Sequence, residues 1–89
     1  MTRHVHQFFL ILYVMNLSEV KLNTKCVIQS VNIKNEKIKL RLMELGLNVG
    51  VKVIVKSKSL MKKTLLIVFN NSCFTIGIES AKNIVVAYA

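Results

Sequence analysis

Residues 41–55 read RLMELGLNVGVKVIV and combine the end of a helix, two glycine turns and the start of a strand. A helix that stops at Gly46 places a glycine where a left-handed backbone is needed, and glycine adopts that conformation without steric cost. Gly50 then turns the chain into a β-branched run with apolar side chains at 51, 53 and 55. The stretch therefore predicts a helix followed by a turn and a strand.

The helix must extend upstream of Gly46, although the residues there carry two conflicting patterns. Residues 37–42 alternate polar and apolar side chains, which taken alone predicts a strand. Asn35 can cap a helix, however, and Gly46 can end it, so we predict a helix over about residues 35–45. One face would carry Ile38, Leu42 and Leu45. The charged side would carry Lys37, Arg41 and Glu44.

The remainder of the chain reads as short strands. Residues 26–31 form a first strand in which neither alternate set is wholly apolar, which predicts a bulge. Residues 64–69 and 72–76 flank Asn70-Asn71, a pair suited to a two-residue hairpin turn. A helical turn over residues 79–83 and a closing strand over residues 84–88 follow. About five short strands and one inserted short α-helix predict a mainly β fold, a small barrel.

The hairpin turn also fixes which strand residues face each other. It pairs Ile67 with Phe74 and Leu65 with Ile76 on the side that we expect to face the core. The other face would carry Leu66, Val68 and Cys73. Both faces are largely apolar, which makes contact with a second copy of the chain one possible use of the hairpin.

The chain is strongly basic, with thirteen Lys and Arg against four acidic residues and a net charge of +9. A basic surface suits nucleic acid, anionic lipid or an acidic protein face. The lysines are scattered, however, and a stacking platform for bases would need exposed aromatic rings. Phe69 and Phe74 are expected in the core, which leaves Tyr88. A basic nucleic-acid-binding barrel is therefore the alternative rather than the main hypothesis.

Residues suited to catalysis or metal binding are sparse. Both histidines lie within the first six residues, and Cys26 and Cys73 stand apart without a Cys-x-x-Cys spacing. The four glutamates are scattered, so no carboxylate pair presents itself for acid–base chemistry. We predict no catalytic residue, no metal ligand set and no cofactor, and hence a protein that is not an enzyme.

The start of the chain differs in character from the rest. Residues 8–15 are an apolar run too short to span a bilayer as a helix, which takes about 20 residues. They follow a basic start without a small-residue cleavage site, so a secretory signal is not well matched. We divide the chain into an N-terminal extension at residues 1–14 and a folded domain at residues 15–89. A packed segment and a membrane anchor are the other interpretations of the extension.

The stretch from Arg41 to Val55 resembles the FeoA family of small ferrous iron transport accessory proteins. The spaced residues Glu79, Ala81, Ile84 and Val86 form a second match. The resemblance implies an SH3-like barrel in a cytoplasmic adaptor or regulator that acts at the inner face of the membrane. Its implied partner is the membrane ferrous iron transporter, FeoB-like, through cytosolic parts that include a GTP-binding domain. Transition metal ion binding is implied only at the level of the family's role.

Two segments are candidates for contact with such a partner. The first is the charged side of the predicted helix, with Lys37, Arg41 and Glu44. The second is a loop with apolar residues where solvent exposure is expected, comprising Leu60, Met61, Lys62 and Lys63. The alternative interpretation is structural, with Met61 closing the barrel end and Arg41 solvating its helix. A peptide-binding module of the SH3 type ranks last, because Trp is absent and exposed aromatics are few.

Overall fold

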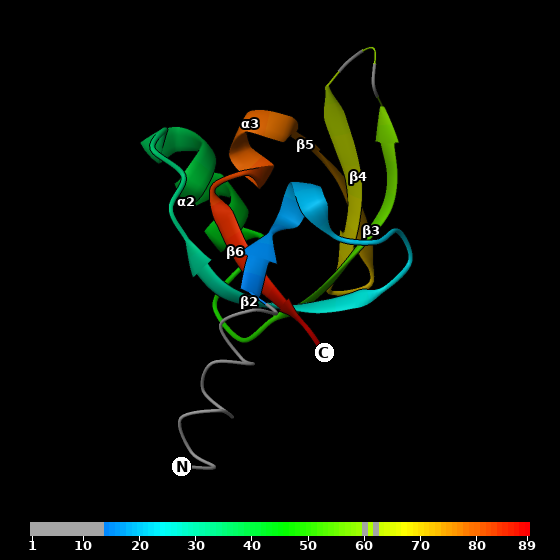
Figure 1. Cartoon of the computed structure of the whole chain (residues 1–89). Coiled ribbons are helices and arrows are strands. Elements are labelled where there is room, and N and C mark those ends of the chain that lie inside the picture. Colours follow the sequence, from blue (N-terminus) through cyan, green and yellow to red (C-terminus); the bar gives the residue numbers. More distant parts are fainter. Residues whose placement is uncertain (1–13, 60, 62) are drawn as a thin grey trace, which may run out of the picture.

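The computed structural model describes residues 14–59, 61 and 63–89, and shows a curled antiparallel sheet with a helix along one side (Figure 1). The strands follow the order β1-β6-β2-β3-β4-β5 across the sheet. The elements are β1 (Val14–Asn16), η1 (Leu17–Glu19), β2 (Lys25–Val31), α2 (Glu36–Glu44), β3 (Lys52–Ser59), β4 (Thr64–Phe69), β5 (Ser72–Gly77), α3 (Ile78–Ala81) and β6 (Ile84–Tyr88). The mainly β barrel with an inserted helix is confirmed.

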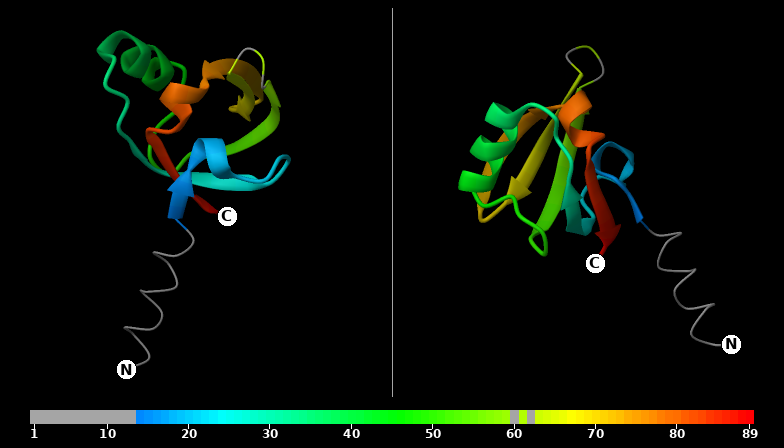
Figure 2. Two further views of the ribbon diagram at one scale, coloured as in Figure 1. Left: turned by 45° about the horizontal axis from the view of Figure 1, so that its top comes forward. Right: turned by 90° about the vertical axis from the view of Figure 1, so that its left-hand side faces the viewer.

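One strand was not predicted. β1 pairs with β6, with Met15 opposite Val86, so the described sheet has six strands rather than about five. The chain then enters η1, where the Asn16 side chain accepts a hydrogen bond from the Ser18 backbone N–H and Glu19 accepts one from the Asn16 N–H. This reciprocal capping box fixes the turn that carries the chain into the barrel. Figure 2 shows β1 and α2 on opposite sides of the barrel.

The predicted β4–β5 hairpin is confirmed in its turn and its register. Asn70 and Asn71 both have positive φ, at 52° and 60°, as a type I′ turn requires. Ile67 lies opposite Phe74 and Leu65 opposite Ile76. The predicted bulge is also present, as a register shift in β2 between Ile28 and Ser30.

The core is a single cluster of apolar side chains drawn from both walls of the barrel. Its members on β3 and β4 alternate with exposed or half-buried residues, as the period of a strand requires. The buried residues are Leu17, Val20, Cys26, Ile28, Ile33, Leu42, Leu47, Val53, Val55, Leu65, Ile67, Phe69, Ile76, Ala81, Ile84 and Val86. Among the described residues, no polar or charged side chain is buried.

The two cysteines occupy different environments, and both are free thiols. Cys26 is buried in the core, and desolvation raises the pKa of its thiol above the ordinary value. Cys73 lies on the exposed outer face of β5. The buried thiol of Cys26 therefore acts as a small apolar side chain.

Helix α2 begins and ends where its sequence signals place it. The Asn35 side chain accepts hydrogen bonds from the backbone N–H groups of Lys37 and Ile38, at 3.0 and 3.2 Å. The helix ends at Gly46, which has a φ of +107°. Of the residues within α2, Leu42 is the one that is buried. The helix therefore rests on the barrel through a narrow apolar contact.

No helix in the described part of the chain is both long enough and apolar enough to cross a membrane.

The environment of Gly46 predicts a strong response to substitution. A Cβ at this position would collide with the Asn70 side-chain amide, and the positive φ disfavours any L side chain. We expect Gly46→Ala to lower the free energy of unfolding by about 1–2 kcal/mol from backbone strain, with a further loss from the collision. Urea denaturation measures this change.

Gly77→Ala is the matched control, because Gly77 has an ordinary φ of −71° and open space around its Cβ position. We expect it to change stability by less than about 0.5 kcal/mol. Equal losses for the two variants would contradict the assignment of Gly46 as a conformational requirement.

Candidate functional site

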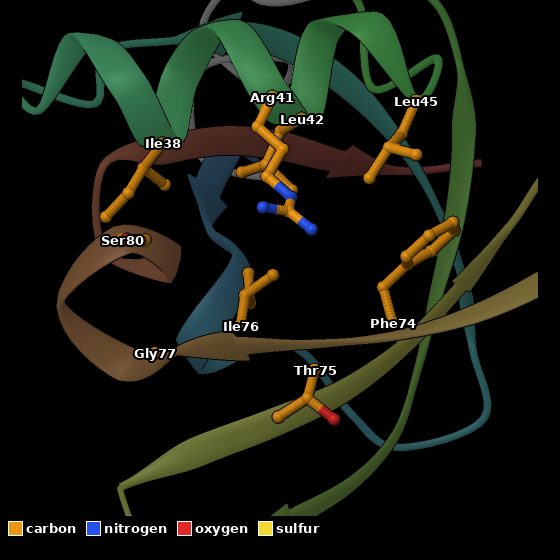
Figure 3. Close-up of a pocket in the computed structure, with 9 residues that line it drawn as sticks. All are labelled: Ile38, Arg41, Leu42, Leu45, Phe74, Thr75, Ile76, Gly77 and Ser80. Atoms are coloured by element: carbon orange, nitrogen blue, oxygen red, sulfur yellow. The ribbon is translucent and has the colours of Figure 1, made fainter.

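A groove opens between helix α2 and strand β5, with a volume of about 420 Å³ (Figure 3). This volume lies within the range of about 300–1,000 Å³ that is usual for ligand sites. The lining is mostly apolar and comes from three elements. The residues are Ile38, Arg41, Leu42 and Leu45 of the α2 segment, Phe74, Thr75, Ile76 and Gly77 of β5, and Ser80 of α3.

The apolar face predicted for the helix forms one wall of this groove. Ile38 and Leu45 lie on either side of Leu42 along the wall, and Figure 3 shows Ile38 over Ser80 and Leu45 over Phe74. Ile38 is 41% exposed and Leu45 is 39% exposed, because the groove is open rather than filled by the barrel. Apolar side chains held half-exposed in this way are available for a partner.

Strand β5 forms the opposite wall, and its aromatic residue is held in place from within the core. The rings of Phe74 and buried Phe69 stack with their centroids 4.7 Å apart. Ile76 is buried beside them, while the Thr75 side chain points away from the groove (Figure 3). This wall is therefore firm, since its side chains belong in part to the core.

Near Leu45, the hairpin turn contacts the end of the helix. The Asn70 side-chain Nδ2 donates a hydrogen bond to the Leu45 carbonyl oxygen at 3.3 Å. Gly46 permits this approach, because a Cβ there would occupy the position of the Asn70 amide. The contact links the end of α2 to the β4–β5 hairpin, beside the buried residues Leu42 and Leu47.

Arg41 is the charged side chain of the groove. Its guanidinium extends between the helix and β5, toward the space between Phe74 and Ile76 (Figure 3). We expected Arg41 on a charged side of the helix with Lys37 and Glu44; all three are exposed, and Arg41 in addition lines the groove. The helix turn puts Arg41 at the border of the apolar face, so its long side chain lies over the groove.

The other predicted contact residues do not share this groove. Lys37 and Glu44 are exposed but do not line it. Met61 is 94% exposed and Lys63 has a positive φ of 53°, with its carbonyl oxygen accepting the Ile78 backbone N–H. Leu60 and Lys62 lie outside the described residues. Figure 1 shows the strands β3 and β4 that this segment joins on the other side of the barrel from α2.

The exposure of Met61 decides between two interpretations of that residue. A side chain that closes the barrel end would be largely buried, and this one is almost fully exposed. The structural interpretation of Met61 is therefore wrong. Sequence reasoning also missed Phe74 and Thr75 as groove residues, since only the position of α2 over β5 reveals them.

In residues 14–59, 61 and 63–89, no group of three or more His, Cys, Asp or Glu side chains could hold a metal ion. The chemistry available at the groove is therefore apolar contact together with one guanidinium.

The hydrogen bond between Asn70 and Leu45 can be tested without changing the conformation of the hairpin turn. We expect Asn70→Gly to destabilise the protein by about 1 kcal/mol, since it removes the bond to Leu45 while keeping the positive φ. Asn71→Gly is the matched control, because it makes the same change at the neighbouring turn position. Urea denaturation and amide hydrogen exchange at the end of α2 measure the difference. Equal stability for the two variants would show that the Asn70 bond does not hold the helix.

Comparison with known proteins places this fold in a family. The FeoA domain matches residues 15–88, nearly the whole described part of the chain. None of the curated proteins compared with the chain matches it.

Several solved structures share the fold. The FeoA of Stenotrophomonas maltophilia, solved with zinc and described as an SH3 domain protein, is 36% identical with a TM-score of 0.70, over 81% of this chain and 88% of that one. The FeoA protein of Chlorobium tepidum is 28% identical with a TM-score of 0.76, over 83% of this chain and 70% of that one.

A manganese-dependent transcriptional repressor shares only the fold, at 9% identity and a TM-score of 0.76, over 85% of this chain and 42% of that one. The match of the FeoA domain across the described barrel shows that the chain belongs to the FeoA family, with the SH3-like fold of that family.

Proposed function

We propose that this protein is a cytoplasmic, non-enzymatic adaptor or regulator of ferrous iron uptake. It would act by contact with the cytosolic part of a membrane ferrous iron transporter, including its GTP-binding domain. Membership of the FeoA family supports the role in iron uptake. The Stenotrophomonas maltophilia FeoA, a member of this family, is described as a candidate ferrous iron transport activating factor.

The α2–β5 groove is the observation that carries the proposal. It offers half-exposed apolar side chains on α2, a firm aromatic wall on β5 and one guanidinium between them. This combination suits a protein partner, because interface centres are apolar while arginine and aromatic residues supply much of the binding energy. A role through contact also fits the described residues, which offer no metal ligand set that could carry iron.

Two further segments belong to the proposed contact surface. Lys37 and Glu44 are exposed on the same helix as the groove and would border a partner seated there. The loop with Leu60, Met61, Lys62 and Lys63 would form a separate contact, and the 94% exposure of Met61 supports it. A partner that reached both regions would have to extend across the barrel end.

The nucleic-acid alternative rests on the net charge of +9. The aromatic rings of the described residues do not form a stacking platform for bases. Phe69 is buried, Phe74 lies in the groove under α2, and the Tyr88 hydroxyl oxygen accepts the Lys21 backbone N–H at 3.0 Å. The alternative therefore lacks the stacking that single-stranded nucleic acid requires.

Co-purification of the full chain with the transporter's soluble GTP-binding region tests the proposal. We expect Ile38→Ser to weaken binding about tenfold or more, because a half-exposed apolar contact in the groove is lost. Leu40→Ser is the matched control, since Leu40 lies on the same helix, is 56% exposed and does not line the groove. Met61→Ser tests the loop separately.

A labelled single-stranded nucleic acid belongs in the same experiment, at low and moderate salt. Binding of the transporter region that survives moderate salt supports the adaptor. Capture of the nucleic acid alone, with affinity that falls steeply with salt, would favour the alternative instead. Equal effects of Ile38→Ser and Leu40→Ser would remove the groove from the proposal.

A further inference from the structure

Strand β5 is an edge of the described sheet, and the face that carries Phe74 and Ile76 forms one wall of the groove. Its one neighbour among the described strands is β4. An edge strand presents backbone N–H and C=O groups that can pair with another extended chain. At the opposite edge of the sheet the last strand is β1, which pairs with β6.

The hairpin turn determines which groups of β5 point to the free side. In a two-residue hairpin the residues flanking the turn, here Phe69 and Ser72, form a hydrogen-bonded pair, and the pairs then alternate. Phe74 and Ile76 therefore pair with β4 through their backbone. Cys73 and Thr75 direct their N–H and C=O groups away from β4.

The side chains of β5 show which face an added strand would continue. Thr75 lines the groove, yet Figure 3 shows its side chain pointing away from the helix, whereas Phe74 and Ile76 point toward it. The groove therefore lies over the face of β5 that carries Phe74 and Ile76. A strand added along the free edge would continue that face, and its alternate side chains would lie next to Phe74 and Ile76, opposite the apolar side chains of α2.

The charge in this space is unbalanced. The Arg41 guanidinium forms no ion pair or hydrogen bond within the part of the chain that the structure describes, where the ion pair present is Lys82 with Glu79 on the surface. A guanidinium over an apolar groove favours a carboxylate, because it can donate two parallel hydrogen bonds to it. The net charge of +9 also favours an acidic partner over a second basic copy of this chain.

We propose that the α2–β5 groove binds an extended partner segment that carries a carboxylate among apolar side chains. The segment adds to β5 as a further strand, through the outward groups of Cys73 and Thr75. Its apolar side chains contact Ile38, Leu45 and Phe74, and its carboxylate pairs with Arg41. This inference rests on the proposed function, because it specifies what part of the partner the groove receives.

The test uses the full chain and two short, end-capped, fluorescein-labelled peptides. Both alternate threonine and valine, and one carries a central glutamate where the other carries glutamine. We expect the glutamate peptide to bind about tenfold more tightly by fluorescence anisotropy. In NMR spectra of the isotope-labelled chain, the amides of Cys73 and Thr75 should become protected from exchange. The amides of Phe74 and Ile76 serve as internal controls, since they already face β4.

Variants test the carboxylate contact with Arg41 and the strand pairing at Thr75 separately. Arg41→Gln should abolish the difference between the two peptides, whereas Lys39→Gln, on the same helix but outside the groove, should preserve it. Thr75→Pro should weaken both peptides at least tenfold, because it removes the outward N–H without breaking a bond to β4. Thr75→Val keeps that N–H and should bind normally. If Thr75→Pro fails to fold, protection of the Cys73 and Thr75 amides in the unaltered chain still decides.

Several results would overturn the inference. They are binding without protection at Cys73 and Thr75, equal affinity for the two peptides, or no binding at millimolar peptide. A dimer whose Cys73 and Thr75 amides are protected without peptide would assign the edge to a second copy. Retention of the transporter region by Thr75→Pro would reject strand addition and leave the adaptor function intact. Peptide binding by a chain that does not retain the transporter region would reject the adaptor function instead.

Discussion

The end of helix α2 is linked to the β4–β5 hairpin by the hydrogen bond from Asn70 to the Leu45 carbonyl, next to Gly46. The helix buries Leu42 and leaves its other apolar residues half-exposed or exposed, so core packing alone holds it weakly. The Asn70 side chain can reach the Leu45 carbonyl because residue 46 has no Cβ. The turn that ends α2 and the turn that joins β4 to β5 both contain residues with positive φ, and this hydrogen bond links them.

Much of this fold could be predicted from the sequence, wherever a local signal determines the structure. Asn35 and Gly46 mark the helix, and Asn70-Asn71 sets a two-residue turn from which the whole β4–β5 register follows. The β2 bulge follows from a strand whose alternation is imperfect. β1 could not be predicted in the same way. Its pairing partner, β6, lies at the far end of the chain, and three residues carry too little pattern to show it.

The candidate site was predictable only in part, because it combines separate elements. The spacing of Ile38, Leu42 and Leu45 correctly placed them on one face. The same analysis put Arg41 on a charged side with Lys37 and Glu44, but a helical period does not show that its long side chain also lines the groove. Phe74 was expected in the core, and it does stack on Phe69. That it also lines a groove depends on the tertiary position of α2, which no local pattern encodes.

The described core is wholly apolar and buries no acidic or basic side chain. Cys26 is the one buried residue there that can ionise, and burial raises the pKa of its thiol, which keeps it neutral at ordinary pH. No group inside the described barrel therefore changes charge as the surroundings become mildly acidic or alkaline. A response of this protein to pH would have to arise at the surface of the described barrel, in residues outside the described ranges or in the partner that we propose.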